Sequence, residues 1–225
     1  LNIAKINSID GDELEWAETL LGRLILFKTN SIWIYFVNGL EENWSLEQSP
    51  TTVGCLAFKT VKKVGNEIWF LGHDGRGEIG VYAFNGQTSR LLTDDITPIM
   101  KDINLQRVSE ACAELHDGLY TLSFPYQSSL TNNKSVDLDI VNIKEDGAPA
   151  IYGLHDLAFY SSAVLNTISR SGEFLMGHQT SGFVHREGGR SFDSVSGTGG
   201  DLIAQRFLSG IYNEGSWETM KRYRE

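Results

Sequence analysis

The sequence predicts an all-β protein and, within that class, a β-propeller of about four to five antiparallel blades. Short segments rich in Ile, Val, Phe and Trp alternate with turns that contain Gly, Asn or Asp, which is typical of antiparallel hairpins. Similar hairpins recur every few tens of residues, as the blades of a propeller do. Apolar spacing of three and four residues is not sustained over any long stretch, so a helical domain is not expected.

The region 20–96 contains the clearest hairpins. Residues 20–27 and 32–37 form the first expected pair of strands. Residues 53–64 and 68–71 form the second pair, and Gly and Asn occupy the turn between them, where tight hairpins favour these residues. Together with the following strands, this region has the size of one propeller blade and its neighbour.

Several stretches between these hairpins are expected to be connections. The charged segment 12–18 and the acidic segment 40–50, which surrounds Trp44, have the composition of exposed links. Segment 93–105 is the one expected helical interruption, and Pro98 limits any helix there to a turn or two.

Weaker copies of the hairpin pattern follow in the second half of the chain. The expected strands are 108–115, 119–124, 136–143, 150–154, 158–169 and 173–177. The Gly- and Ser-rich stretch 188–201 is expected to be a flexible loop. We therefore assign 1–200 to a propeller domain and 201–225 to a closing strand and the start of an exit segment. Closure would pair a strand at 3–9 with one at 202–209.

Four aromatic residues occupy matching places in the hairpins and define a structural aromatic repeat: Trp33, Trp69, Tyr120 and Phe174. We expect them to pack between blades, with Trp33 and Trp69 buried. Trp44 and Trp217 stand in polar surroundings and are candidates for surface contact.

The composition limits the compartment and the partners. The net charge is −10, which argues against a nucleic-acid surface over most of the chain, because phosphate neutralisation requires clustered Lys and Arg. Cys55 and Cys112 lie among small apolar residues and are expected to be buried free thiols. No apolar run has the length of a membrane helix and no signal peptide opens the chain, which favours synthesis in a cytoplasm.

The sequence offers few groups that would carry chemistry. Asp137 and Asp139 are two residues apart on an expected strand, so they point to one face and could share a proton or a cation. A nucleophile elbow and a phosphate loop are absent from the sequence. Ser191-Phe192-Asp193 begins a turn known from sialidase-type propellers, but the Gly and Trp that should follow are missing. No catalytic, cofactor-binding or metal residues are assigned, and we do not expect an enzyme.

Six segments resemble the β-propeller regions of tailed-phage tail-tube, nozzle and neck proteins: 24–35, 54–75, 81–86, 91–96, 113–125 and 173–187. In that family a strand ending in Phe-Lys precedes a Ser-Ile-Trp/Tyr strand. A Val-Gly-Asn-x-Ile-Trp/Tyr-Phe-Leu strand and an Asp-Gly turn follow. The resemblance rests on structural turns and aromatic residues and transfers no catalytic residue.

The resemblance implies a non-enzymatic structural component of a phage virion, made in the host cytoplasm and located in the tail or neck. Its implied partners are other virion proteins in a homo-oligomeric ring, with DNA passing through the channel without specific binding. The chain lacks the flanking platform domain of that family and begins with Leu1, so we expect a piece of a longer polypeptide. An acidic channel wall would repel DNA and let it slide; tight, salt-sensitive DNA binding would contradict this hypothesis.

Two other functions remain open. A glycan-binding or carbohydrate-active propeller would use Trp44 and Trp217 as stacking platforms. A bacterial cell-surface interaction domain would be expected to have a signal peptide and disulfides, and the sequence has only two distant cysteines.

Overall fold

The chain folds into a series of small antiparallel β-sheets, so the prediction of an all-β protein is confirmed. A computed structural model describes residues 12–37, 39–145, 147–165, 172–178, 184–186, 192–193 and 201–202. Most strands pair with their neighbours in sequence, so the sheets are antiparallel meanders, with one exception at the start of the second sheet. Such local pairing follows directly from the hairpin pattern of the sequence.

The first sheet contains four strands in sequence order: β1 (Leu14–Leu20), β2 (Arg23–Lys28), β3 (Ile32–Phe36) and β4 (Ser45–Gln48). The second sheet contains β5 (Gly54–Cys55), β6 (Lys62–Val64), β7 (Glu67–His73), β8 (Ile79–Phe84) and β9 (Ser89–Leu91). Both β5 and β6 pair with β7, and β8 and β9 follow in order.

The third sheet contains β10 (Cys112–His116), β11 (Leu119–Phe124), β12 (Lys134–Ile143) and β13 (Pro149–His155). The fourth contains β14 (Ser161–Leu165), β15 (Glu173–Gly177) and β16 (Val184–Arg186). A separate two-stranded pair is formed by β17 (Phe192–Asp193) and β18 (Asp201–Leu202).

Helical structure is confined to short turns between strands. These are η1 (Glu41–Asn43), η2 (Phe58–Thr60), η3 (Asp94–Ile96), α1 (Thr97–Lys101) and η4 (Leu105–Glu110). The predicted interruption at 93–105 is therefore confirmed. Pro98 lies in the first turn of α1, where its missing N–H costs no hydrogen bond.

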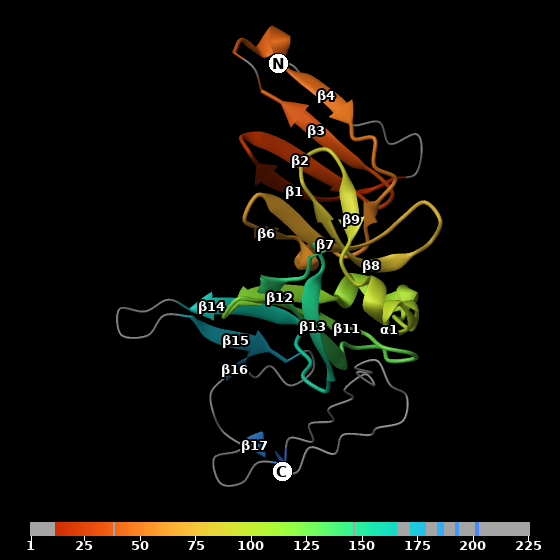
Figure 1. The fold of residues 1–225 in the computed structure, drawn as a ribbon, viewed down its shortest axis with the longest axis vertical. Helices are drawn as coiled ribbons and strands as arrows, with labels where there is room; N and C mark the ends of the chain where they lie inside the picture. The colour runs from red at the N-terminus through yellow and green to blue at the C-terminus, as the bar shows by residue number, and fades with distance from the viewer. Residues whose placement is uncertain are drawn as a thin grey trace.

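The four sheets stack face to face along the longest axis of the molecule, from the first sheet at the top of Figure 1 to the fourth sheet near the bottom. The central strands of the second sheet, β7 and β8, therefore have two buried faces. Along β7, Ile68 and Phe70 pack toward the first sheet, whereas Trp69 and Leu71 pack toward the third. This explains the continuous apolar run Ile68–Leu71, because a strand covered on both faces loses the apolar–polar alternation.

Three apolar cores hold the stack together. The core between the first and second sheets includes Phe27, Ile32 and Phe84, all fully buried. The largest core lies between the second and third sheets, where residues 100–108 also contribute. The core between the third and fourth sheets is small and consists of Cys112, Phe159, Phe174 and Met176.

Both cysteines lie in these cores as free thiols, as predicted. Cys55 packs between the first and second sheets, and Cys112 between the third and fourth. Burial raises the pKa of each thiol to about 12, because the thiolate would lose its hydration. Both thiols are therefore protonated at neutral pH.

Three local predictions were wrong. The segment 12–18 is not a connection: β1 begins at Leu14 and forms the edge of the first sheet. The segment 40–50 contains a further edge strand, β4. These strands were missed because edge strands are mostly exposed and lack an apolar face. The expected strand 53–64 is divided by η2, where the Thr60 hydroxyl hydrogen-bonds the Ala57 carbonyl oxygen at 2.6 Å.

The described residues form an open stack and show no closure into a propeller. The predicted pairing of 3–9 with 202–209 falls almost entirely outside the described ranges, as does the segment assigned to 201–225. What the structure establishes is thus a series of antiparallel sheets packed on one another, and not a closed ring of blades.

Candidate functional site on the third sheet

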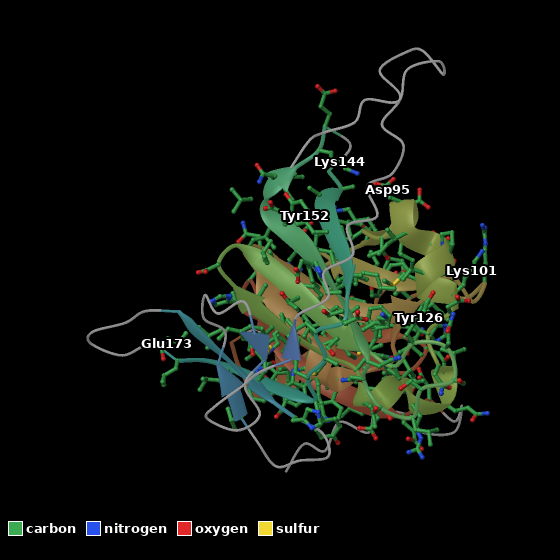
Figure 2. The ribbon with its side chains drawn as sticks, turned by 90° about the horizontal axis from the view of Figure 1, so that it is seen from below. Asp95, Lys101, Tyr126, Lys144, Tyr152 and Glu173 are labelled. Carbon is green, nitrogen blue, oxygen red and sulfur yellow. The ribbon has the colours of Figure 1, made fainter. Side chains whose placement is uncertain are left out.

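The third sheet has one apolar face and one polar face. On β12, Val136 and Leu138 pack into the core beneath the second sheet, whereas Ser135, Asp137 and Asp139 lie on the opposite face. Figure 2, seen from the fourth-sheet end, looks toward this polar face, and Tyr152 of β13 is labelled there. Polar residues on the covered face of a sheet require hydrogen-bond partners.

Asp137 is held by two neighbouring strands. Its Oδ1 accepts a hydrogen bond from the Thr121 hydroxyl of β11 at 2.7 Å. Its Oδ2 lies 3.1 Å from Nε2 of His155 at the end of β13. The Asp137 carboxylate raises the pKa of His155 by stabilising the protonated imidazole, and burial opposes this only in part. The three side chains thus connect β11, β12 and β13 across the sheet.

A β-bulge aims His155 at this carboxylate. The pairing of β12 with β13 changes register between Ser135 and Asp137, because β13 has one residue more than its partner over this interval. Gly153 lies in the bulge with φ of +101°. A Cβ atom at this glycine would lie 2.7 Å from Cδ2 of His155, so the imidazole rests directly on the glycine backbone. Only glycine provides both the backbone conformation and the room for the ring.

Asp139 stabilises a second irregularity, on β12 itself. The register shifts between Asp139 and Ile143, and Oδ1 of Asp139 accepts the backbone N–H groups of Val141 and Asn142 at 2.8 and 2.9 Å. Its Oδ2 accepts from Nδ2 of Asn142 and from the Tyr152 hydroxyl. These hydrogen bonds, foremost those from Asn142, lower the pKa of Asp139 to about 2.

The two carboxylates therefore have separate partners rather than a shared proton or cation. Within the described part of the chain, no three His, Cys, Asp or Glu side chains are grouped so that they could hold a metal ion. The Thr121 hydroxyl donates its hydrogen bond to Asp137 and not to His155. The imidazole therefore does not activate this hydroxyl as a nucleophile. The cluster has the geometry of an anchor that fixes the end of β13.

Sequence reasoning identified Asp137 and Asp139 but missed Thr121, His155 and Gly153. Thr121 and His155 are remote from Asp137 in sequence, and only the strand register brings them together. Gly153, directly before the Leu-His pair of β13, belongs to no distinctive motif, although an isolated glycine inside a strand is a known signal of a bulge.

Glu114 of β10 is a second polar junction that the sequence did not indicate. Its carboxylate pairs with Lys62 of β6 at 3.1 Å and accepts the Ser162 hydroxyl of β14 at 3.2 Å. It also accepts the N–H of Leu115 at 3.1 Å. One carboxylate thus joins the edges of the second, third and fourth sheets.

The four residues of the predicted aromatic repeat do not occupy equivalent positions. Tyr120 and Phe174 are each the second residue of the second strand in their sheet and pack toward the preceding sheet. Trp69 is the third residue of its strand, so it points the opposite way and meets the Tyr120 ring at 5.7 Å. Trp33 lies on a third strand, β3, and is only half-buried.

Three of these residues pack between neighbouring sheets. Trp69, Tyr120 and Phe174 are at most 2% exposed, and the Tyr120 hydroxyl donates to the buried Thr60 carbonyl oxygen at 2.7 Å. Trp33 lies on the face of the first sheet that points away from the second, which explains its exposure. Its indole N–H donates to the Ser31 hydroxyl at 3.0 Å.

Of the two tryptophans predicted to make surface contacts, Trp44 is half-buried. Its ring lies edge-on against Tyr35, with centroids 6.0 Å apart and an interplanar angle of 79°. Trp217 lies outside the described residues. Trp44 therefore contributes to the packing of the first sheet rather than standing free on the surface.

Comparisons with known proteins do not assign the chain to a family: no family model matches it, and a search of curated proteins gave no match. The described helices are all too short to cross a membrane.

Proposed function

We propose that this chain is a non-enzymatic structural module that works through protein–protein contacts, as one part of a ring-shaped phage tail or neck assembly around a DNA channel. The phage assignment rests on the sequence resemblance. The single structural observation that supports a scaffold role is the stack of meanders, in which polar side chains tie one sheet to the next.

Side-chain hydrogen bonds and ion pairs join neighbouring sheets at several levels of the stack. Arg90 of β9 donates to the Gly147 carbonyl oxygen in the β12–β13 hairpin at 2.6 Å and pairs with Glu67 at 2.7 Å. In Figure 2, Lys144 of the same hairpin lies beside Asp95 of η3, with which it forms an ion pair. Ion pairs and hydrogen bonds of this kind join neighbouring sheets and support a rigid module.

Free strand edges are a hazard for a protein that must assemble in a defined way. On β1, the N–H of Thr19 is capped by the Glu18 carboxylate at 2.8 Å, and on β10 Glu114 caps Leu115 in the same manner. A carboxylate on an edge N–H blocks the addition of a foreign strand. This supports association through faces and loops rather than through edge pairing.

Assembly of the polypeptide that carries this chain tests the proposal. Electron microscopy of the purified protein should reveal closed rings with a central channel. A protein that remains monomeric at micromolar concentration, or that hydrolyses a substrate at a rate abolished by His155→Gln, would overturn it. The glycan-binding function does not receive support from Trp44, because its ring is used in packing against Tyr35.

A further inference from the structure

A hollow of about 410 Å³ lies at the end of the first sheet, where the β1–β2 turn meets the segment between β3 and β4. Its apolar wall is formed by Leu21, Phe36 and Val37. Its polar wall is formed by Arg23, Asn43, Ser45 and Glu47. The hollow is open to solvent, and its lining is more polar than apolar.

Leu21 lies at the rim of the hollow with a positive φ, which the two-residue turn requires but a branched apolar residue rarely adopts. Its φ is +49°, and its side chain is 63% exposed. The equivalent two-residue turn of the third sheet has Asp117 at this position with φ of +45°, and aspartate tolerates such values better than a branched apolar residue. The two-residue turn between β1 and β2 thus holds an exposed apolar side chain beside the hollow.

The charges in the hollow restrict the kind of ligand it accepts. Arg23 lies over the Phe36 ring with its guanidinium carbon 5.0 Å from the centroid, and Glu47 lines the same hollow. An anion would be repelled by Glu47 and a cation by Arg23. A neutral ligand with hydroxyl groups can accept hydrogen bonds from the guanidinium and donate to the carboxylate at once. The Asn43 amide and the Ser45 hydroxyl can each donate and accept hydrogen bonds.

Trp44 holds the polar wall in place. It lies between Asn43 and Ser45 in sequence, and its ring packs against Tyr35 and not into the hollow. The Ser45 hydroxyl donates to Oε1 of Glu47 at 3.2 Å, which orients that carboxylate. The contact between Trp44 and Tyr35 thus fixes the segment that carries Asn43 and Ser45 on the first sheet.

We propose that this hollow binds a neutral saccharide of one or two rings. The apolar C–H face of the sugar would lie on Leu21, Phe36 and Val37, and its hydroxyl edge would meet Arg23, Asn43 and Glu47. This binding function is separate from the scaffold role, and the hollow lies beside the core between the first and second sheets, against which Phe36 packs.

The test is titration of the full chain with lactose, maltose, cellobiose and N,N′-diacetylchitobiose, followed by protein NMR, with 3′-sialyllactose as the charged comparison. At least one neutral disaccharide should shift the resonances of residues 21–23 and 43–47. Arg23→Gln and Glu47→Gln should each weaken that binding tenfold or more. Both side chains are exposed, so thermal unfolding should be unchanged in these variants.

Arg76→Gln is the matched control, because Arg76 is exposed in a turn of the second sheet outside the hollow, and it should leave binding intact. The proposal is overturned if none of the four neutral sugars binds, if only 3′-sialyllactose does, or if both hollow variants bind as tightly as the unchanged chain.

Discussion

Asp139 is the carboxylate whose ionised form this fold stabilises most clearly. Its oxygens accept two backbone N–H groups of the β12 irregularity, the Asn142 amide and the Tyr152 hydroxyl. The pKa falls from an ordinary 3.8 to about 2. A lowered pKa in the folded state means that the stabilisation is complete above pH 3.8 and is lost as the pH falls toward 2.

We therefore expect Asp139→Asn to unfold at a higher pH than the unchanged chain during acid titration followed by circular dichroism. Asp94→Asn, at an exposed carboxylate of η3, should leave the acid midpoint in place. Equal midpoints for Asp139→Asn and the unchanged chain would contradict the role assigned to these hydrogen bonds.

His155 has the opposite pH dependence. Asp137 raises its pKa above the ordinary 6.5, so the stabilisation by the charged ring is complete below pH 6.5 and is lost as the pH rises through the raised value. NMR titration of the imidazole should give this raised pKa, and Asp137→Asn should return it toward 6.5. An unchanged His155 titration in Asp137→Asn would show that the ion pair does not form.

Among the structural elements, the bulge in β13 is the one that most strictly requires a particular residue, Gly153. Gly153→Ala introduces both a strained φ and a clash with the His155 ring, and we expect a loss of about 3 kcal/mol in unfolding free energy. Gly77→Ala is the matched control, because Gly77 has φ of +84° but open space around its Cβ position, and should cost about 1–2 kcal/mol. Chemical denaturation measures both. Equal losses would mean that the imidazole does not lie on Gly153.

The hairpins of the sheet interiors were predictable from sequence, because their strands are apolar and their turns contain Gly, Asn or Asp. Strands β2, β3, β7 and β11 match their predicted positions closely. Edge strands such as β1 were not predictable, because most of their residues are exposed and they lack an apolar face.

The polar face could be predicted only in part. The spacing of Asp137 and Asp139 placed them on one face, but the partners of each depend on two register shifts. The equivalence of the aromatic residues failed for a similar reason: a shift of one residue along a strand moves a side chain to the opposite face, as it does for Trp69 relative to Tyr120.

For the molecule as a whole, cohesion depends on the apolar cores between sheets. Trp69 and Tyr120 meet in the largest of them, so Trp69→Ala should cost about 3–5 kcal/mol in unfolding free energy. Trp16→Ala removes an aromatic ring that is 42% exposed and stacks on Phe58, and should cost about 0.5–1.5 kcal/mol. Urea denaturation measures the unfolding free energy of both variants. Similar costs would indicate that the second and third sheets do not pack as a single core.

The central claim is that this stack is an assembly module. The most direct measurement is sedimentation velocity of the purified polypeptide, combined with electron microscopy of the same sample. The account predicts a single closed oligomer, seen as a ring with an open channel and unaffected by moderate salt, because its contacts are expected to be mainly apolar. A monomer across the micromolar range, with no rings in the images, would contradict it.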